Sequence, residues 1–367
     1  MNSSKFFKLS NLLGLTLLTS YTYLFLKDSS PFWKSKDWIT DDVMQQAYQF
    51  HQVFKPGLFA NDIITDSMTA YLAPLHYWLC YFITWLCGDV VVMTHWVMGI
   101  QIFLTAAFIF LTINHCVGIF PASLGALWFL HSGILIQRLA GGLPRGWVAP
   151  LIAAYLYYAS KKNHAAVLIT LLTACFLNSL AAFLLITSYG LYLCINLMRK
   201  NQRPLLYRPF INFLILCPVF YAATLYVTKR PEHIGKMVTY EEALNMPALS
   251  SKKGRFKIAP IPPAAQEFRN QSFQIFSVDY HKVLRKYKRY VPQITLSLIV
   301  LFCLVGLIRK INPANSVILS FAAAIIICYF LSRLLAFNLY VPNRYIRFPV
   351  SIFFICFFSI AAWKVFH

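Results

Sequence analysis

Long apolar runs recur from one end of this chain to the other, and they restrict its fold more than any other feature. A helix that crosses the hydrocarbon core of a bilayer needs about 20 mostly apolar residues. Charged residues make up only 12% of the 367 positions, whereas soluble domains carry about a quarter. This balance excludes an ordinary soluble enzyme and a disordered chain. The runs that qualify, or nearly do, are 9–26, 71–87, 90–113, 117–136, 147–160, 209–227, 291–308, 313–331 and 347–363.

The stretch 164–198 would be about 52 Å long as one helix, which is too long for a single crossing. We expect a break at Asn178-Ser179 into two short spans. Lys5 and Lys8 precede the first apolar run, and no small-x-small cleavage site follows it, so we interpret 9–26 as an uncleaved anchor. The sequence therefore predicts an all-α polytopic membrane protein with about ten or eleven transmembrane helices of uneven length.

Basic residues predict the orientation. Lys5 and Lys8 place the N-terminus in the cytoplasm by the positive-inside rule, and the short loops that then fall inside carry basic and no acidic residues. We expect an integral protein of a bacterial inner membrane. Positions 70 and 138 both fall outside, so an even number of crossings must lie between them, yet the sequence has three apolar runs there. A re-entrant pair or two short helices within 117–136 would make the number even. Asp89 is then expected at a cytoplasmic turn.

This topology divides the chain into five parts. They are a first transmembrane helix (1–26), a first exoplasmic loop with juxtamembrane helices (27–70), a transmembrane bundle (71–227), a long basic exoplasmic loop (228–290) and C-terminal transmembrane helices (291–367).

The first exoplasmic loop holds half of the twelve acidic residues: Asp28, Asp37, Asp41, Asp42, Asp62 and Asp66. Thr40 is a good N-cap, so residues 41–53 are expected to form an amphipathic helix that ends at Pro56-Gly57. A second short helix is expected from Asn61-Asp62.

Two interpretations of these acids stay open. Asp41 and Asp42 are either catalytic or complement a helix dipole in its first turn. Asp62 and Asp66 are four residues apart and share a helix face, either as part of a site or as solvated loop acids.

Arginines flank the predicted outer loops. Arg138 and Arg145 border a turn that contains Gly141-Gly142 and Pro144, and Arg344, Tyr345 and Arg347 follow a Pro-Asn step. The planar guanidinium suits bidentate phosphate binding, so we expect these residues to bind a lipid phosphate. The alternative is anchoring to headgroups, which we favour for Arg333.

Other residues carry weaker signals. His76, just inside the run 71–87, is either a site histidine or a satisfied core histidine. The nine cysteines lie in or beside apolar runs and are expected to pack. We expect no metal site and no cofactor, although a divalent cation would be compatible with the acids. Nucleic acid is a poor partner for the basic loop 228–290, because that loop is predicted to be exoplasmic.

The N-terminal region, with its inside N-terminus, one span and an acid-bearing loop, resembles the C-type (GT-C fold) membrane glycosyltransferases. Asp41-Asp42 matches the Asp/Glu motif of that superfamily, and FANDIITDSMTAYLAPLHYW looks like its return into a second span. The resemblance implies a polyprenyl-phosphate sugar donor, with Asp41 or Asp42 as the base. Many members have an acidic residue on a later loop where this chain has Arg138 to Arg145.

Two other functions stay open. A transporter of lipid-linked glycans would carry charges deep in its spans, which are almost free of them here. A non-catalytic scaffold or assembly subunit would use the acids as helix starts and the arginines as anchors. A geometric criterion separates the scaffold from the enzyme: in an enzyme, first-loop carboxylates and the arginines converge.

Overall fold

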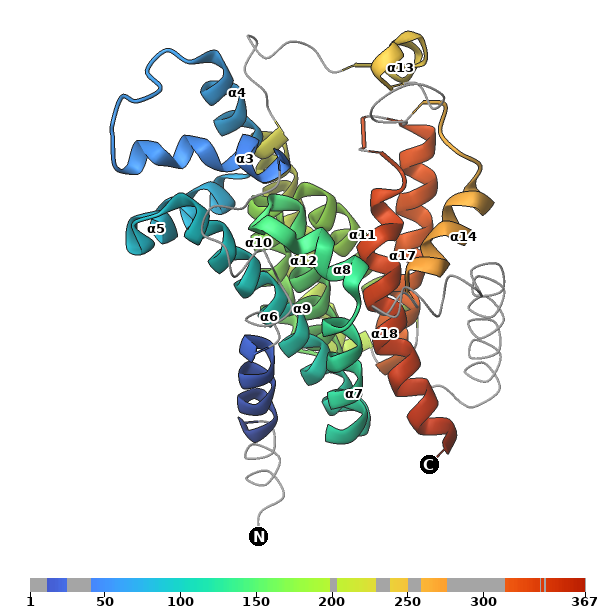
Figure 1. Ribbon diagram of the computed structural model, residues 1–367. Helices are drawn as coiled ribbons and strands as arrows, with labels where there is room; N and C mark the ends of the chain where they lie inside the picture. Colours follow the sequence, from blue (N-terminus) through green and yellow to red (C-terminus); the bar gives the residue numbers. More distant parts are fainter. Residues whose placement is uncertain are drawn as a thin grey trace.

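The computed structural model describes residues 12–24, 41–198, 203–228, 238–249, 259–275, 314–336, 338–339 and 341–366 (Figure 1). The regular elements within these ranges are helical. Several sequence predictions lie outside the described residues: the signals at Lys5, Lys8 and Thr40, the acids Asp28 and Asp37, and the span 291–308.

Five helices of the described chain are long and apolar enough to cross a membrane: α6 (Val90–Val117), α11 (Ser179–Leu197), α12 (Arg203–Thr228), α17 (Ala314–Leu334) and α18 (Arg344–Phe366). A sixth span is formed if α7 (Ile119–Leu130) and α8 (Gly133–Leu139) count together, with a bend of 64° at their break. The chain is thus an all-α polytopic membrane protein.

Four of the predicted spans correspond to short helices. They are Leu12–Leu24, α5 (Pro74–Cys87), α9 (Val148–Ser160) and α10 (His164–Leu177). Helices of 13 or 14 residues are about 20 Å long, less than the ~30 Å hydrocarbon core. The ten or eleven expected spans are therefore five or six long helices and these shorter ones within the described residues.

The predicted break at Asn178-Ser179 is confirmed. Asn178 has an extended backbone, and its side chain accepts a hydrogen bond from the backbone N–H of Ala181, so it caps α11. An asparagine favours such a position because its amide oxygen satisfies an N–H that has no partner inside the helix.

Figure 1 shows that helices α3 (Asp41–Ala47) and α4 (Ile63–Tyr71) lie at one end of the bundle, and the first described helix (Leu12–Leu24) and the end of α18 at the other. We call the first the Asp42 end and the second the Lys161 end. At the Lys161 end, His115 is hydrogen-bonded to the backbone of Ser160, and Lys364 interacts electrostatically with Cys116. Lys161 and Lys364, which the positive-inside rule assigns to one side, therefore lie together.

The chain between α6 and α9 crosses the bundle only once. The start of α6 packs against Gly142, where a Cβ would lie 2.8 Å from the Thr94 carbonyl oxygen, so α8 ends beside the start of α6. The region for which a re-entrant pair or two short helices was expected thus contains two short helices, α7 and α8, bent by 64° at their break.

Asp89 is the N-cap of α6, so it lies at the Asp42 end, whereas Lys161, which the sequence prediction places on the same side as Asp89, interacts with His115 at the other end of this helix. α5 precedes Asp89: its start contacts Trp147 and its end leads directly into α6.

The described part of the first loop, residues 41–70, folds as the sequence predicts. α3 continues into the 3-10 helix η1 (Tyr48–Val53), and a turn at Pro56-Gly57 follows, where Gly57 has a φ of +86°. α4 then begins directly after Asp62. These helices end where the local signals place them.

Part of the basic loop forms α13 (Tyr240–Asn245), η6 (Pro247–Leu249) and α14 (Ala264–Ile275), of which α14 packs along α18. The proline-rich stretch before α14 is not helical, as expected. Gln271 on α14 donates hydrogen bonds to the Arg347 carbonyl oxygen (2.7 Å) and to Ser351 Oγ (2.8 Å). The described cysteines are all free, and half of them are buried.

Candidate functional site

The segment from Arg138 to Trp147 has a defined shape. Gly141 and Gly142 have φ values of +81° and +63°, a region that favours glycine because it carries no Cβ. A Cβ on Gly146 would lie 2.2 Å from the side-chain oxygen of Gln101, so the backbone approaches α6 closely. Gln101 Nε2 donates a hydrogen bond of 3.1 Å to the Leu143 carbonyl.

Two further hydrogen bonds hold this segment from other helices. Asn178 Nδ2 donates to the Pro144 carbonyl oxygen at 3.3 Å, and Trp147 Nε1 donates to Nδ1 of His76 at 3.0 Å. Contacts with α5, α6 and the start of α11 thus fix the turn that separates Arg138 from Arg145.

Asp42 and Arg145 form an ion pair. Arg145 Nη1 lies 3.1 Å from Asp42 Oδ2, and the two side chains are 41% and 49% exposed, respectively. α3 reaches this position because Val43, the next residue, packs directly on Gly141. A first-loop carboxylate and an arginine of the 138–147 segment therefore lie in contact.

The four predicted phosphate-binding arginines gather around this pair. Arg138 is repelled electrostatically by both Arg145 and Arg347, and Arg347 by both Arg145 and Arg344. We call Arg138, Arg145, Arg344 and Arg347 the arginine cluster. They come from α8, η3 (Pro144–Trp147) and the first turn of α18.

The cluster has an excess of positive charge. Asp42 pairs with Arg145, and Glu267, which attracts Arg347, is already paired with Arg333 at 3.0 Å. The first turn of α18 carries no acidic residue, and cations are unfavourable at a helix N-terminus. Arg145 Nε is buried without a hydrogen-bond partner among the described residues. An anionic ligand would satisfy that donor and lower the mutual repulsion.

Asp41 and Asp42 are not equivalent. Asp41 is exposed, and its Oδ1 accepts the backbone N–H of Asp42 at 2.9 Å, as an acidic residue in a first turn does. Asp42 forms an ion pair with Arg145 of the arginine cluster.

Asp62 and Asp66 serve α4. Asp62 is its N-cap and accepts hydrogen bonds from Thr65 Oγ1 (2.6 Å) and from the Thr65 backbone N–H (3.0 Å). These bonds hold the pKa of Asp62 below its ordinary value. Asp66 is exposed in the first turn. Thr65 Oγ1 also lies 3.2 Å from Tyr48 Oη, so α4 is fixed on η1.

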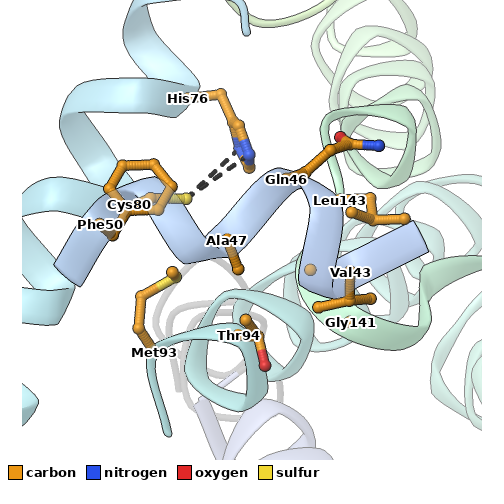
Figure 2. A pocket seen from close by; sticks show the side chains of 11 residues that line it. Val43, Gln46, Ala47, Phe50, His76, Cys80, Met93, Thr94, Gly141 and Leu143 are labelled. Carbon is orange, nitrogen blue, oxygen red and sulfur yellow. Dashed lines mark hydrogen bonds between the residues drawn. The ribbon is translucent and has the colours of Figure 1, made fainter. Parts of the chain in front are cut away.

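His76 is a core residue. It is 3% exposed, and burial lowers its pKa to about 3, so it is neutral and accepts the bond from Trp147. It lines a narrow pocket between α3, α5, α6 and the Gly141-Gly142 turn, and Figure 2 shows it beside Cys80. The pocket has room for about one water molecule.

Tyr345 is buried as well. It is 1% exposed, and its ring packs edge-on against Phe183. Its neighbours Arg344 and Arg347 are exposed, so the aromatic residue fixes the start of α18 while the arginines face outwards.

Two residues beside the arginine cluster were not predicted from the sequence. Glu267 is buried on α14, where it accepts hydrogen bonds from Arg333 and from Tyr329 Oη. Gln271 lies one turn further on and binds the backbone of Arg347. Their only signal in the sequence is that Glu267 and Gln271 are four residues apart, as on one face of a helix, after a proline-rich segment. Arg333 is thereby an internal ion-pair partner and not a free headgroup anchor.

Metal ligands do not gather in the described part of the chain, where no group of three His, Cys, Asp or Glu side chains can hold an ion. No family model, curated protein or solved structure matches this chain. The fold and the site themselves define the class: an all-α polytopic membrane protein with an arginine cluster and a paired carboxylate at one end of its bundle.

Proposed function

We propose that this protein is an integral membrane glycosyltransferase that takes sugar from a polyprenyl-phosphate donor. Asp42 acts as the general base, and the arginine cluster binds the donor phosphate. The observation that carries the proposal is the 3.1 Å contact between Asp42 and Arg145, which brings a first-loop carboxylate to the cluster.

The chemistry needs both kinds of group. The acceptor hydroxyl gives its proton to the base as its oxygen forms a bond to the anomeric carbon, and the bond from that carbon to the phosphate oxygen breaks. The leaving phosphate carries the developing negative charge. A general base contributes about 10²–10⁴-fold, and donors aimed at the developing charge contribute more. Asp42 is half-exposed and thus accessible to an acceptor.

The donor would reach the cluster from the lipid. Arg138 and Arg347 lie at the ends of α8 and α18, which belong to apolar segments of the bundle. A polyprenyl chain would lie along these helices, with its phosphate at their ends.

A second candidate is an anionic-lipid binding protein without transfer activity, such as an assembly subunit. The observation in its favour is that the Asp42 carboxylate is already paired with Arg145. In that case Asp42 orients Arg145 and accepts no proton.

A transfer assay separates the two. The full-length protein in vesicles is supplied with labelled polyprenyl-phosphate sugars, and wild type is compared with Asp42→Asn. We expect the variant to lose about 10²–10⁴-fold in transfer rate while it keeps its affinity for polyprenyl phosphate.

The matched control is Asp89→Asn, an exposed carboxylate at the same end whose capping of α6 an asparagine preserves. Wild-type transfer by Asp42→Asn would exclude Asp42 as the base. Binding of the lipid phosphate without transfer by the wild type would favour the second candidate.

A further inference from the structure

Helix α5 has two different faces. His76, Cys80, Ile83 and Thr84 are buried against the bundle, all at 7% exposure or less. The opposite face is apolar and exposed, and its aromatic members Trp78, Phe82 and Trp85 are between 53% and 63% exposed. The full exposed set is Leu75, Trp78, Tyr81, Phe82, Trp85 and Leu86.

Both ends of α5 lie at the Asp42 end of the bundle. Near its start, His76 binds Trp147 of η3. It stops at Gly88, which has a φ of +71°, and Asp89 then caps α6. Figure 1 shows α5 beside α3, at the far end of the bundle from the end of α18. With 14 residues it is about 21 Å long.

We propose that α5 lies in the membrane interface on the Asp42 side, with its exposed face among the lipid headgroups and the upper acyl chains, and that it does not cross the membrane. A contiguous apolar face of this kind requires a cover. Lipid fits it because tryptophan and tyrosine concentrate where one edge of the ring is apolar and the other is wet. Lipid is also on hand, because α5 packs directly on α6, a helix long and apolar enough to span the membrane. α5 itself carries no Asp, Glu, Lys or Arg that would form the polar rim of a protein interface.

This placement sets the depth of the candidate site. The hydrogen bond between His76 and Trp147 joins α5 to η3, which carries Arg145. An interfacial α5 therefore holds Arg145 at the level of lipid phosphates. The inference is independent of sugar transfer, because it concerns α5 and the bilayer alone.

Tryptophan quenching by brominated lipids tests the depth. The full-length protein is reconstituted in phosphatidylcholine vesicles with bromine either near the headgroup or near the bilayer centre. We expect that Trp78→Phe with Trp85→Phe removes a larger share of the quenching by shallow bromine than by deep bromine. Both positions are exposed, so the fold tolerates the change. Greater loss at the bilayer centre would show that α5 crosses. If shallow and deep bromine each quench the variant as much as the wild type, protein or water covers this face.

Sidedness gives an independent test. Asp89→Cys is introduced with Cys87→Ser into the full chain, and sealed vesicles of one orientation are treated with a membrane-impermeant maleimide. Reference variants are Asp66→Cys at the Asp42 end and Lys162→Cys at the Lys161 end. We expect Asp89→Cys to label from the same side as Asp66→Cys. Labelling only from the side of Lys162→Cys would overturn the proposal.

Discussion

The Asp42–Arg145 pair allows a prediction in which two substitutions act with opposite sign. If Arg145 binds a lipid phosphate, Asp42 competes with that phosphate for the same guanidinium. Arg145→Gln should then weaken binding, whereas Asp42→Asn should leave it unchanged or strengthen it.

The structure sets the magnitudes. The paired side chains are 41% and 49% exposed, and exposed ion pairs contribute about 0.2–1 kcal/mol. Release of Arg145 by Asp42→Asn should therefore tighten binding by at most about fivefold. A hydrogen bond to a charged group contributes about 1.5–3 kcal/mol, so Arg145→Gln should weaken binding by roughly 10- to 100-fold.

The assay is equilibrium binding of a labelled short-chain polyprenyl phosphate to the protein in lipid nanodiscs, with Arg269→Gln on the exposed side of α14 as the control. The double variant should bind like Arg145→Gln alone, because no guanidinium then remains at position 145 for the Asp42 substitution to release. The reasoning is refuted if Arg145→Gln binds as tightly as wild type, or if Asp42→Asn weakens binding as much as Arg145→Gln does.

Three further predictions concern the fold around the site, and thermal unfolding in detergent measures the first two. Gly142→Ala should destabilise the folded protein by about 2 kcal/mol, because its Cβ would lie 2.8 Å from a backbone atom at a φ of +63°. Gly57 also has a positive φ but lies in open space, so Gly57→Ala should cost only about 1 kcal/mol. Arg333→Met should cost about 3 kcal/mol, since it leaves the buried carboxylate of Glu267 unpaired, and an unchanged unfolding temperature would exclude that pair as a stabilising contact. Asp62→Ala should speed amide hydrogen exchange at the start of α4, while Asp62→Asn should not, because the asparagine amide oxygen accepts the same bonds. The additional stabilisation from the ionised carboxylate should be complete at neutral pH and should decrease as the pH falls from about 3.8 through the lowered pKa, because the ionised form accepts these bonds more strongly.

Local signals predicted the helix boundaries well. Asp62 and Asn178 cap helices where the sequence indicates, because a short polar side chain can satisfy an N–H two or three residues away without help from the rest of the fold. The turn at Gly57 follows from the same kind of local chemistry. Such features depend only on neighbours in the chain.

Hydropathy alone does not decide how α5 lies. An apolar run of this length is compatible with a crossing helix or with one that lies flat, since both bury a similar number of apolar side chains. In the structure, Pro74 and Gly88 limit the helix to 14 residues, and α6 starts at the end of the bundle where α5 begins. The parity of the topology therefore depended on one helix whose direction no local pattern encodes.

By itself, the sequence determined the class of this protein and the inventory of its chemistry. Apolar runs require a membrane, and the acids and arginines are confined to a few loops. The tertiary structure decided which of these residues meet. It placed Asp42 against Arg145, 103 positions away, gathered four arginines from three segments, and buried His76 and Tyr345. The physical reason is that composition fixes the free energy of transfer into lipid, whereas a site depends on contacts between residues that only the packing of α3, α8 and α18 brings together.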